Sequence, residues 1–277
     1  GGHSSLQANG GRIVATEGNG YFLRYFDEAT LGAKGLTVES DYDVTIDQSF
    51  ADQDGASGVL TLTGAGTKKL SGTASSESLL VAAGGTVEFT ASARHASALV
   101  VTNGAAVTLP AEVAAVGMLK GLSLGDSTGF GQLNLVSGTE LVVNGDTEIA
   151  LAKIAYTGEL ARGTKNTIRV RGTVSNASRN AWTSNTMLVS PLAEGDAASF
   201  TVRTDNSDTL LEVEIVENDN VIRVEEDTMV EEPAPYGAGA TLSTIVGANA
   251  TLDLNGHDVT ISSGYATPTA QVTITNS

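Results

Sequence analysis

A short strand–turn–strand unit recurs in this sequence and limits the folds open to it. Its template is a small residue, then Gly, two free positions, an apolar residue, a free position and a second apolar residue. Four copies fit the template: VAAGGTVEF at 81–89, VTNGAAVTL at 101–109, LVSGTELVV at 135–143 and DLNGHDVTI at 253–261. A unit this short cannot bury an apolar face alone, so its recurrence predicts stacked coils that share one core.

The shared positions of the template predict both the turns and the core. Gly adopts a positive φ at little cost, so the aligned glycines should form the turns, and they are Gly84, Gly104, Gly138 and Gly256. Side chains alternate between the two faces of a strand, so the two apolar positions should point inward. These positions are Val87, Phe89, Val107, Leu109, Leu141, Val143, Val259 and Ile261. The first two glycines are 20 residues apart, which predicts that strands 87–89 and 107–109 are parallel neighbours.

Composition and charge narrow the class of protein further. The 277 residues are 41% apolar and only 5% aromatic, which suits a narrow core of branched aliphatic side chains in one large all-β domain or two ordinary ones. A formal net charge of −17 repels phosphate backbones and anionic membranes, so no nucleic-acid partner is expected. The absence of Cys excludes disulfide scaffolds and thiolate zinc sites. No apolar run approaches the ~20 residues of a membrane span.

Three segments depart from the repeat pattern. The aromatic patch YFLRYF at 21–26 is expected to be an edge strand or a cap over the first coil, and capping or core is favoured over carbohydrate stacking. The stretch 110–124 has helical spacing weakened by two glycines and predicts one short helical turn at most. Residues 152–186 contain Trp182 and six of the 15 basic residues, and they read as an irregular, more mobile excursion that projects from the stack or caps it.

Two further segments bear on the domain organisation. The sequence DNSD at 205–208 lies between two alternating apolar runs and predicts a β-hairpin. The acidic, Pro- and Gly-rich EEPAPYG at 231–237 marks a turn or short linker. We therefore expect a repeat-built solenoid over residues 1–217, and a continuation or a second repeat block over 218–277.

Three phrases of the sequence resemble a known repeat: LTLTGAG at 60–66, LVVTNGAAVTL at 99–109 and ATLDLNGHDVTI at 250–261. They are similar to the autotransporter-associated β-strand repeats in the passenger regions of secreted bacterial surface proteins. The expected hairpin at 200–216 resembles the strand pair that often closes a block of such repeats. The resemblance covers about residues 36–149 and 198–277, and it implies a right-handed parallel β-helix exported to the cell surface. It places no catalytic motif on any residue, and the open strand pattern at the C-terminus leads us to expect that the native chain continues.

The sequence contains no evident catalytic constellation. A nucleophilic triad needs a nucleophile, a base and an orienting acid. The chain has no Cys and no G-x-S-x-G motif, while His3, His95 and His257 lie in the tail, a loop and a turn. Asp41 and Asp43 would share one strand face, the geometry of a glycosidase carboxylate pair, although many surface pairs meet the same spacing. We assign no catalytic, cofactor-binding or metal residue.

One acidic segment is compatible with a calcium ion. Asp47, Asp52 and Asp54, with the carbonyls near Gly55, form an acidic loop, and Ca²⁺ takes six to eight oxygen ligands. The run lacks the terminal Glu of an EF-hand, so calcium is kept only as an alternative to no cofactor. The acidic residues at 225–227 read as a solvated face.

These observations favour a non-enzymatic extracellular surface or adhesive scaffold, as a segment of a larger exported bacterial protein. The partners it suggests are host or extracellular glycans or surface proteins, and the oligomeric state stays open. The alternative is a carbohydrate-active enzyme, a glycosidase or polysaccharide lyase, on a β-helix. A groove with three or more charged residues on one face would favour the enzyme. A smooth face with satisfied Asn and Thr ladders would favour the scaffold.

Overall fold

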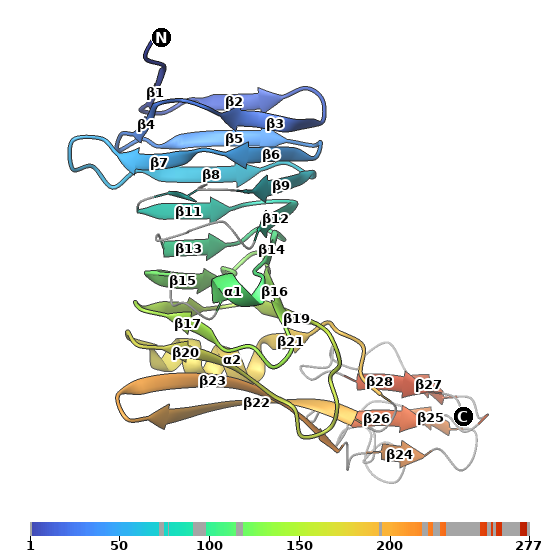
Figure 1. The fold of residues 1–277 in the computed structure, drawn as a ribbon. Helices are drawn as coiled ribbons and strands as arrows, with labels where there is room; N and C mark the ends of the chain where they lie inside the picture. The colour runs from blue at the N-terminus through green and yellow to red at the C-terminus, as the bar shows by residue number, and fades with distance from the viewer. Residues whose placement is uncertain are drawn as a thin grey trace. The chain divides into compact units, whose positions relative to one another are not determined.

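The computed structural model is an all-β parallel solenoid, as the repeat predicted (Figure 1). It describes residues 2–71, 75–76, 78–90, 98–114, 119–193, 196–217, 221–223, 228–230, 250–253, 256, 259–261 and 272–275. By their contacts the residues form two compact units. The first comprises Gly1–Glu159, Lys165–Ser190 and Phe200–Val213, and the second comprises Leu160–Thr164, Pro191–Ser199 and Glu214–Ser277.

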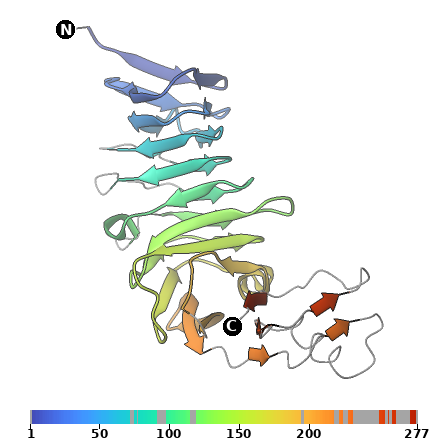
Figure 2. The same cartoon turned by 90° about the vertical axis from the view of Figure 1, so that its right-hand side faces the viewer.

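Two long parallel sheets carry the stack, and within the described residues they have seven and eight strands (Figure 1, Figure 2). The 7-stranded sheet, in the order β18-β15-β13-β11-β8-β5-β2, consists of β2 (Arg12–Ala15), β5 (Leu36–Ser40), β8 (Val59–Thr63), β11 (Leu79–Ala82), β13 (Ala98–Val101), β15 (Gly121–Leu124) and β18 (Thr147–Ile149). The 8-stranded sheet, in the order β21-β19-β16-β14-β12-β9-β6-β3, consists of β3 (Asn19–Arg24), β6 (Val44–Asp47), β9 (Thr67–Leu70), β12 (Thr86–Phe89), β14 (Ala106–Thr108), β16 (Gly131–Val136), β19 (Ala152–Thr157) and β21 (Thr186–Leu188). Each coil from β2–β3 to β18–β19 adds one strand to each sheet, and β21 then extends the 8-stranded sheet alone.

Smaller sheets form a third side of several coils. The first of them, in the order β1-β4-β7-β10, consists of β1 (Ser5–Ala8), β4 (Glu28–Leu31), β7 (Ser49–Asp52) and β10 (Ser75–Ser76). The second, in the order β17-β20-β23-β22, consists of β17 (Leu141–Val143), β20 (Lys165–Val170), β22 (Asp196–Asp205) and β23 (Asp208–Glu217). Only Asn206 and Ser207 connect β22 to its sheet neighbour β23, and a connection this short joins antiparallel strands, which confirms the predicted hairpin.

The strands beyond residue 220 belong to the second unit, and they also pair in parallel. One sheet has the order β24-β26-β28, and the other pairs β25 with β27. Their bounds are β24 (Val221–Arg223), β25 (Thr228–Val230), β26 (Ala250–Asp253), β27 (Val259–Ile261) and β28 (Val272–Thr275). The predicted inward side chains of Val259 and Ile261 lie outside the described part of the structure.

The core of the first unit consists of apolar columns that repeat once per coil. Leu80 lies opposite Leu60 on one side and opposite Leu99 on the other, and all three are at most 2% exposed. The predicted inward positions Val87, Phe89, Val107, Leu109, Leu141 and Val143 are all buried. Val87 pairs in parallel with Val107, which confirms a 20-residue coil at this point. Because burying one such side chain contributes about 1.5–3 kcal/mol, these columns supply much of the stability of the stack.

The predicted glycine turns are confirmed, and they also explain how the coils approach one another. Gly84, Gly104, Gly138 and Gly256 have φ values of +141°, +77°, +78° and +79°. At neighbouring Gly85 a Cβ atom would meet the carbonyl oxygens of Gly64, Ala65 and Gly66 in the preceding coil. Parallel strands lie only ~4.8 Å apart, so corners stacked at that spacing need residues without a side chain.

The third copy of the template occupies a different corner from the first two. In the 8-stranded sheet Val107 lies opposite Leu133, whereas Leu141–Val143 forms β17 and pairs with β20. The third copy therefore does not stack in register with the first two, although Leu141 and Val143 are buried as predicted. The template describes a local turn between strands, and more than one corner of a coil can use such a turn. The short helix α1 (Ala111–Ala114) precedes this coil and confirms the single helical turn predicted there.

Residues 152–186 build the stack and do not depart from it as predicted. Strand β19 pairs with β16 over six residues, from Ala152 to Thr157. Helix α2 (Asn176–Ser184) follows β20 and lies beside the last strand of the 7-stranded sheet, where Ser178 Oγ accepts a hydrogen bond of 3.1 Å from the Ile149 amide. Lys153 in β19 and Arg169 in β20 alternate with buried neighbours, so these basic residues lie on the outer faces of strands. In the described residues, neither helix is long and apolar enough to cross a membrane.

Candidate functional site

The predicted carboxylate pair holds adjacent coils together. Asp41 and Asp43 lie in the bend between β5 and β6, so they do not share a strand face as expected. Oδ1 of Asp41 accepts a hydrogen bond of 2.9 Å from the Ala65 amide, and Oδ1 of Asp43 accepts one of 2.9 Å from the Thr67 amide. Both donors belong to the next coil. The hydrogen bonds from Thr67 hold the pKa of Asp43 below its ordinary value.

Other corners of the stack use aspartate in the same way. Asp126 accepts hydrogen bonds from the Thr102 hydroxyl (2.5 Å) in the preceding coil and from the Thr128 and Gly129 amides in its own bend. These bonds, and first the one from Thr102, hold the pKa of Asp126 far below its ordinary value. Asp146 accepts a hydrogen bond of 2.7 Å from the Thr173 amide, again between coils. Some of the many acidic residues therefore serve as hydrogen-bond acceptors between neighbouring coils.

The predicted calcium loop is not gathered into one cluster. No group of three or more His, Cys, Asp or Glu side chains among the described residues is arranged to hold a metal ion. Asp52 accepts a hydrogen bond of 2.9 Å from the Gly58 amide, and its other oxygen accepts one from the Ser78 hydroxyl. Asp54 is exposed and has a φ of +51° in a tight turn. Calcium binding therefore stays a prediction. Of the remaining candidates, His3 is exposed, and His95, His257 and residues 225–227 lie outside the described residues.

A buried lysine was missed by the sequence analysis. Lys68 is 0% exposed and occupies the core column between Val44 and Val87. Its Nζ donates hydrogen bonds to the carbonyl oxygens of Gly64 and Gly66 in the adjoining turn. Burial lowers the pKa of this ammonium group. A signal was present, because Lys68 alternates with Leu70 at the apolar positions of its strand.

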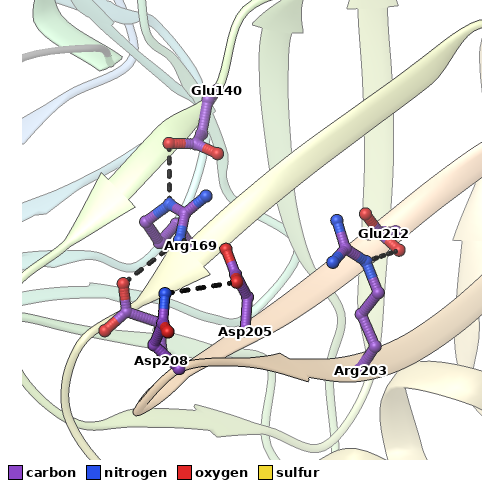
Figure 3. A network of polar contacts seen from close by, with 7 residues as sticks. Glu140, Arg169, Arg203, Asp205, Asp208 and Glu212 are labelled. Atoms are coloured by element: carbon purple, nitrogen blue, oxygen red, sulfur yellow. Dashed lines mark hydrogen bonds and ion pairs between the residues drawn. The ribbon is translucent and has the colours of Figure 1, made fainter.

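The most extensive polar network joins β20 to the hairpin (Figure 3). Nε of Arg169 donates to Oε1 of Glu140 at 2.9 Å, and Nη1 lies 3.2 Å from carboxylate oxygens of both Asp205 and Asp208 at the hairpin turn. These hydrogen bonds raise the pKa of Arg169, so the guanidinium stays charged. One cation thus links three carboxylates from separate parts of the chain.

The hairpin is also fixed on its other side by Trp182. The indole is 0% exposed, and its Nε1 donates to the carbonyl oxygens of Thr201 at 3.1 Å and Glu212 at 3.3 Å. The ring of Phe200 meets the indole edge-on, with the ring centroids 5.5 Å apart. The hairpin is thus attached as a structural element, and its turn carboxylates Asp205 and Asp208 are occupied by that attachment.

A third arrangement consists of Tyr21, Arg24 and Tyr25, which we call the tyrosine–arginine cluster. Strand β3 lies at the end of the 8-stranded sheet, in agreement with the predicted edge strand, but the expectation of core residues is wrong for the tyrosines, since Tyr21 is 66% and Tyr25 is 75% exposed. The Arg24 guanidinium carbon lies 3.5 Å from the ring centroid of Tyr21 and 4.2 Å from that of Tyr25. Both lengths are within the range of cation–π attraction.

An irregularity in β3 places this cluster on the surface. The register between β3 and β6 shifts between Asn19 and Leu23, and Tyr25 has a φ of +66°. Such a bulge re-aims side chains, and a bulky residue at positive φ is uncommon. Leu23 stays buried while the two tyrosines turn outward. Sequence periodicity misses this change because the insertion breaks the alternation on which the prediction rests.

Comparisons with protein-family models, with curated proteins and with solved structures found no match to this chain. A function is therefore inferred from the fold, the corner aspartates, the Arg169 network and the tyrosine–arginine cluster.

Proposed function

We propose that this chain is a non-catalytic scaffold with adhesive contacts, exported to the bacterial cell surface as a passenger segment of the autotransporter type. The observation that carries the proposal is the use of corner aspartates as hydrogen-bond acceptors between coils, at Asp41, Asp43, Asp126 and Asp146. A catalytic carboxylate has to be free to move a proton or attack a substrate. A carboxylate that accepts backbone amides from the next coil serves the integrity of the stack.

The outer face of the 8-stranded sheet supports the same proposal. Asn134 Nδ2 donates to Thr108 Oγ1 at 3.0 Å, and Gln132 Nε2 donates to Asn134 Oδ1 at 2.8 Å. Thr63 Oγ1 donates to the Ala83 carbonyl at 3.1 Å in the next coil of the 7-stranded sheet. The bonds of Asn134 with Thr108 and of Thr63 with Ala83 thus join neighbouring coils, while that of Gln132 with Asn134 lies within β16. Polar side chains satisfied in this way are expected of a scaffold face.

A parallel stack also suits adhesion for a physical reason. Its stability comes from inward columns and from corners, so outward side chains can change with little effect on the fold. Weak contacts spread along one rigid body add through effective concentration. The net charge of −17 keeps separate molecules apart in solution. The repeat resemblance adds the expectation of export to the cell surface.

The proposal is tested by incubating the purified chain with immobilised mucin and with plant and bacterial polysaccharides. We expect retention on at least one surface, without new reducing ends or unsaturated uronate products. Turnover that is abolished by Asp41→Asn or Asp43→Asn would install the carbohydrate-active enzyme instead. Retention on no surface would refute the adhesive role. Protease treatment of intact producing cells should remove the full-length protein, and its protection would contradict surface exposure.

A further inference from the structure

The side chain of Arg24 differs from the other arginines that the structure describes. Its guanidinium contacts two tyrosine rings and, among the described residues, has no hydrogen-bond or ion-pair partner. Every other described arginine side chain has a polar partner, and these are Arg12, Arg162, Arg169, Arg171, Arg179 and Arg203. The chain has 32 acidic and 15 basic residues, so an arginine held away from carboxylates is unexpected.

The local geometry shows how Arg24 is kept unpaired. Asp47 lies opposite Arg24 in the register of β3 with β6, yet no ion pair joins the two residues. The guanidinium carbon instead lies over the rings of Tyr21 and Tyr25. Its N–H groups lie in the plane of the guanidinium and point outward from its edge, and no hydrogen bond to a described residue engages them. A guanidinium edge of this kind binds a carboxylate through two parallel hydrogen bonds.

We propose that the tyrosine–arginine cluster binds a sugar that carries a carboxylate, at the end of an extracellular glycan. The Arg24 fork receives the carboxylate, and the exposed tyrosines offer apolar ring surface to the C–H face of the sugar while their hydroxyls stay hydrated. The charge of −17 disfavours a long polyanion, so one terminal acidic sugar fits the surface better than a uniformly acidic polysaccharide. This inference rests on the proposed adhesive function and names the ligand class for one site on the stack.

The cluster has features that favour specific recognition over a general attraction of anions. Contact with two rings restricts the guanidinium before a ligand arrives, so less side-chain freedom is lost on binding. Lysine at the same position would keep the charge but lose the planar fork and the stacking. The response to Arg24→Lys therefore separates recognition by geometry from recognition by charge.

The experiment measures binding of the whole chain to surfaces that display glucuronic acid or, as the neutral analogue, glucose. Free methyl glucuronide serves as the competitor. The variants are Arg24→Gln, Arg24→Lys and Tyr21→Ala. The matched control is Arg12→Gln, on strand β2, which precedes β3 in the chain, because it removes the same charge from an arginine already paired with Glu39 at 2.7 Å. Far-ultraviolet circular dichroism verifies that each variant is folded.

We expect selective binding to the glucuronic acid surface, inhibited by methyl glucuronide. Arg24→Gln and Arg24→Lys should each weaken binding at least about tenfold, and Tyr21→Ala several-fold, while Arg12→Gln binds like the unaltered chain. The inference is overturned by equal binding to both sugars, by full binding of Arg24→Gln, or by an equal loss in Arg12→Gln. Retention on mucin or polysaccharide that survives Arg24→Gln would remove this site and leave the adhesive function standing. Retention on no surface would remove both.

Discussion

The close approach of the coils at their glycine corners can be measured with two substitutions. Gly85 and Gly104 have similar backbones, with φ values of +61° and +77°, so Ala at either position meets the same left-handed conformation. That conformation costs a residue with a Cβ atom about 1–2 kcal/mol. The surroundings of the two positions differ. An added Cβ at Gly104 has no heavy atom within 4 Å, whereas at Gly85 it would lie 2.6 Å from the Gly66 oxygen and 2.8 Å from the Ala65 oxygen.

Gly104→Ala should therefore lower the free energy of unfolding by about 1–2 kcal/mol. Gly85→Ala should lower it by about 2–5 kcal/mol, since forcing apart closely packed backbone adds about 1–3 kcal/mol to the same conformational cost. The assay is urea unfolding followed by far-ultraviolet circular dichroism, with the slope compared between variants to verify that the same surface unfolds. Equal losses in the two variants, or a larger loss in Gly104→Ala, would refute the idea that glycine is needed at these corners for contact between coils.

Three further predictions concern polar groups of the stack. The depressed pKa of Asp126 means that its carboxylate stabilises the fold above the ordinary Asp pKa of 3.8, and that this stabilisation is lost as the pH falls below 3.8. In a plot of the urea midpoint against pH, Asp126→Asn should therefore reduce the fall at acid pH, and an unchanged fall would contradict this. Burial lowers the pKa of Lys68, so the folded chain releases this proton at lower pH than the unfolded chain, and the free energy of unfolding should rise with pH towards 10.5. Lys68→Met should lack that rise, and a rise retained in this variant would show that another group causes it. Trp182 is the single Trp, so its fluorescence reports the attachment of the hairpin; Arg169→Gln should shift the fluorescence transition to lower urea than the dichroism transition, whereas coincident shifts would show that the hairpin unfolds only with the whole stack.

The repeat in the sequence was sufficient for the regular part of the fold. Val87 and Val107 could be placed as parallel inward neighbours because one template step equals one coil there, and nothing between them interrupts the period. Leu141 could be placed inward, but its strand partner could not be predicted. The 34-residue step from Gly104 to Gly138 passes a short helix and a change of corner, and a local template carries no information about either.

The segments that were predicted wrongly show which information the periodicity of the sequence does not contain. Basic residues at 152–186 indicated a loop, yet Lys153 and Arg169 lie on the outer faces of strands that belong to the stack. The alternation of Lys68 with Leu70 indicated an inward position, but not its carbonyl partners in Gly64 and Gly66, which become available only once the turn has folded. The exposure of Tyr21 depends on a register shift between β3 and β6, which exists only when both strands are paired.

The location of the proposed ligand site follows from how the stack uses its polar groups. A hydrogen bond to an external ligand contributes little if an equivalent internal bond has to be broken, because the exchange is nearly balanced. At the hairpin, the donors of Arg169 are already engaged by Glu140, Asp205 and Asp208 (Figure 3). At the bulge of β3, Arg24 contacts two tyrosine rings and has no hydrogen-bond or ion-pair partner among the described residues, so its donors reach a ligand without that exchange. The hairpin and the bulge of β3 are both irregular places in the stack, but only at the bulge does an arginine have donors without a partner among the described residues. A carboxylate ligand therefore gains net binding free energy at Arg24 and not at Arg169.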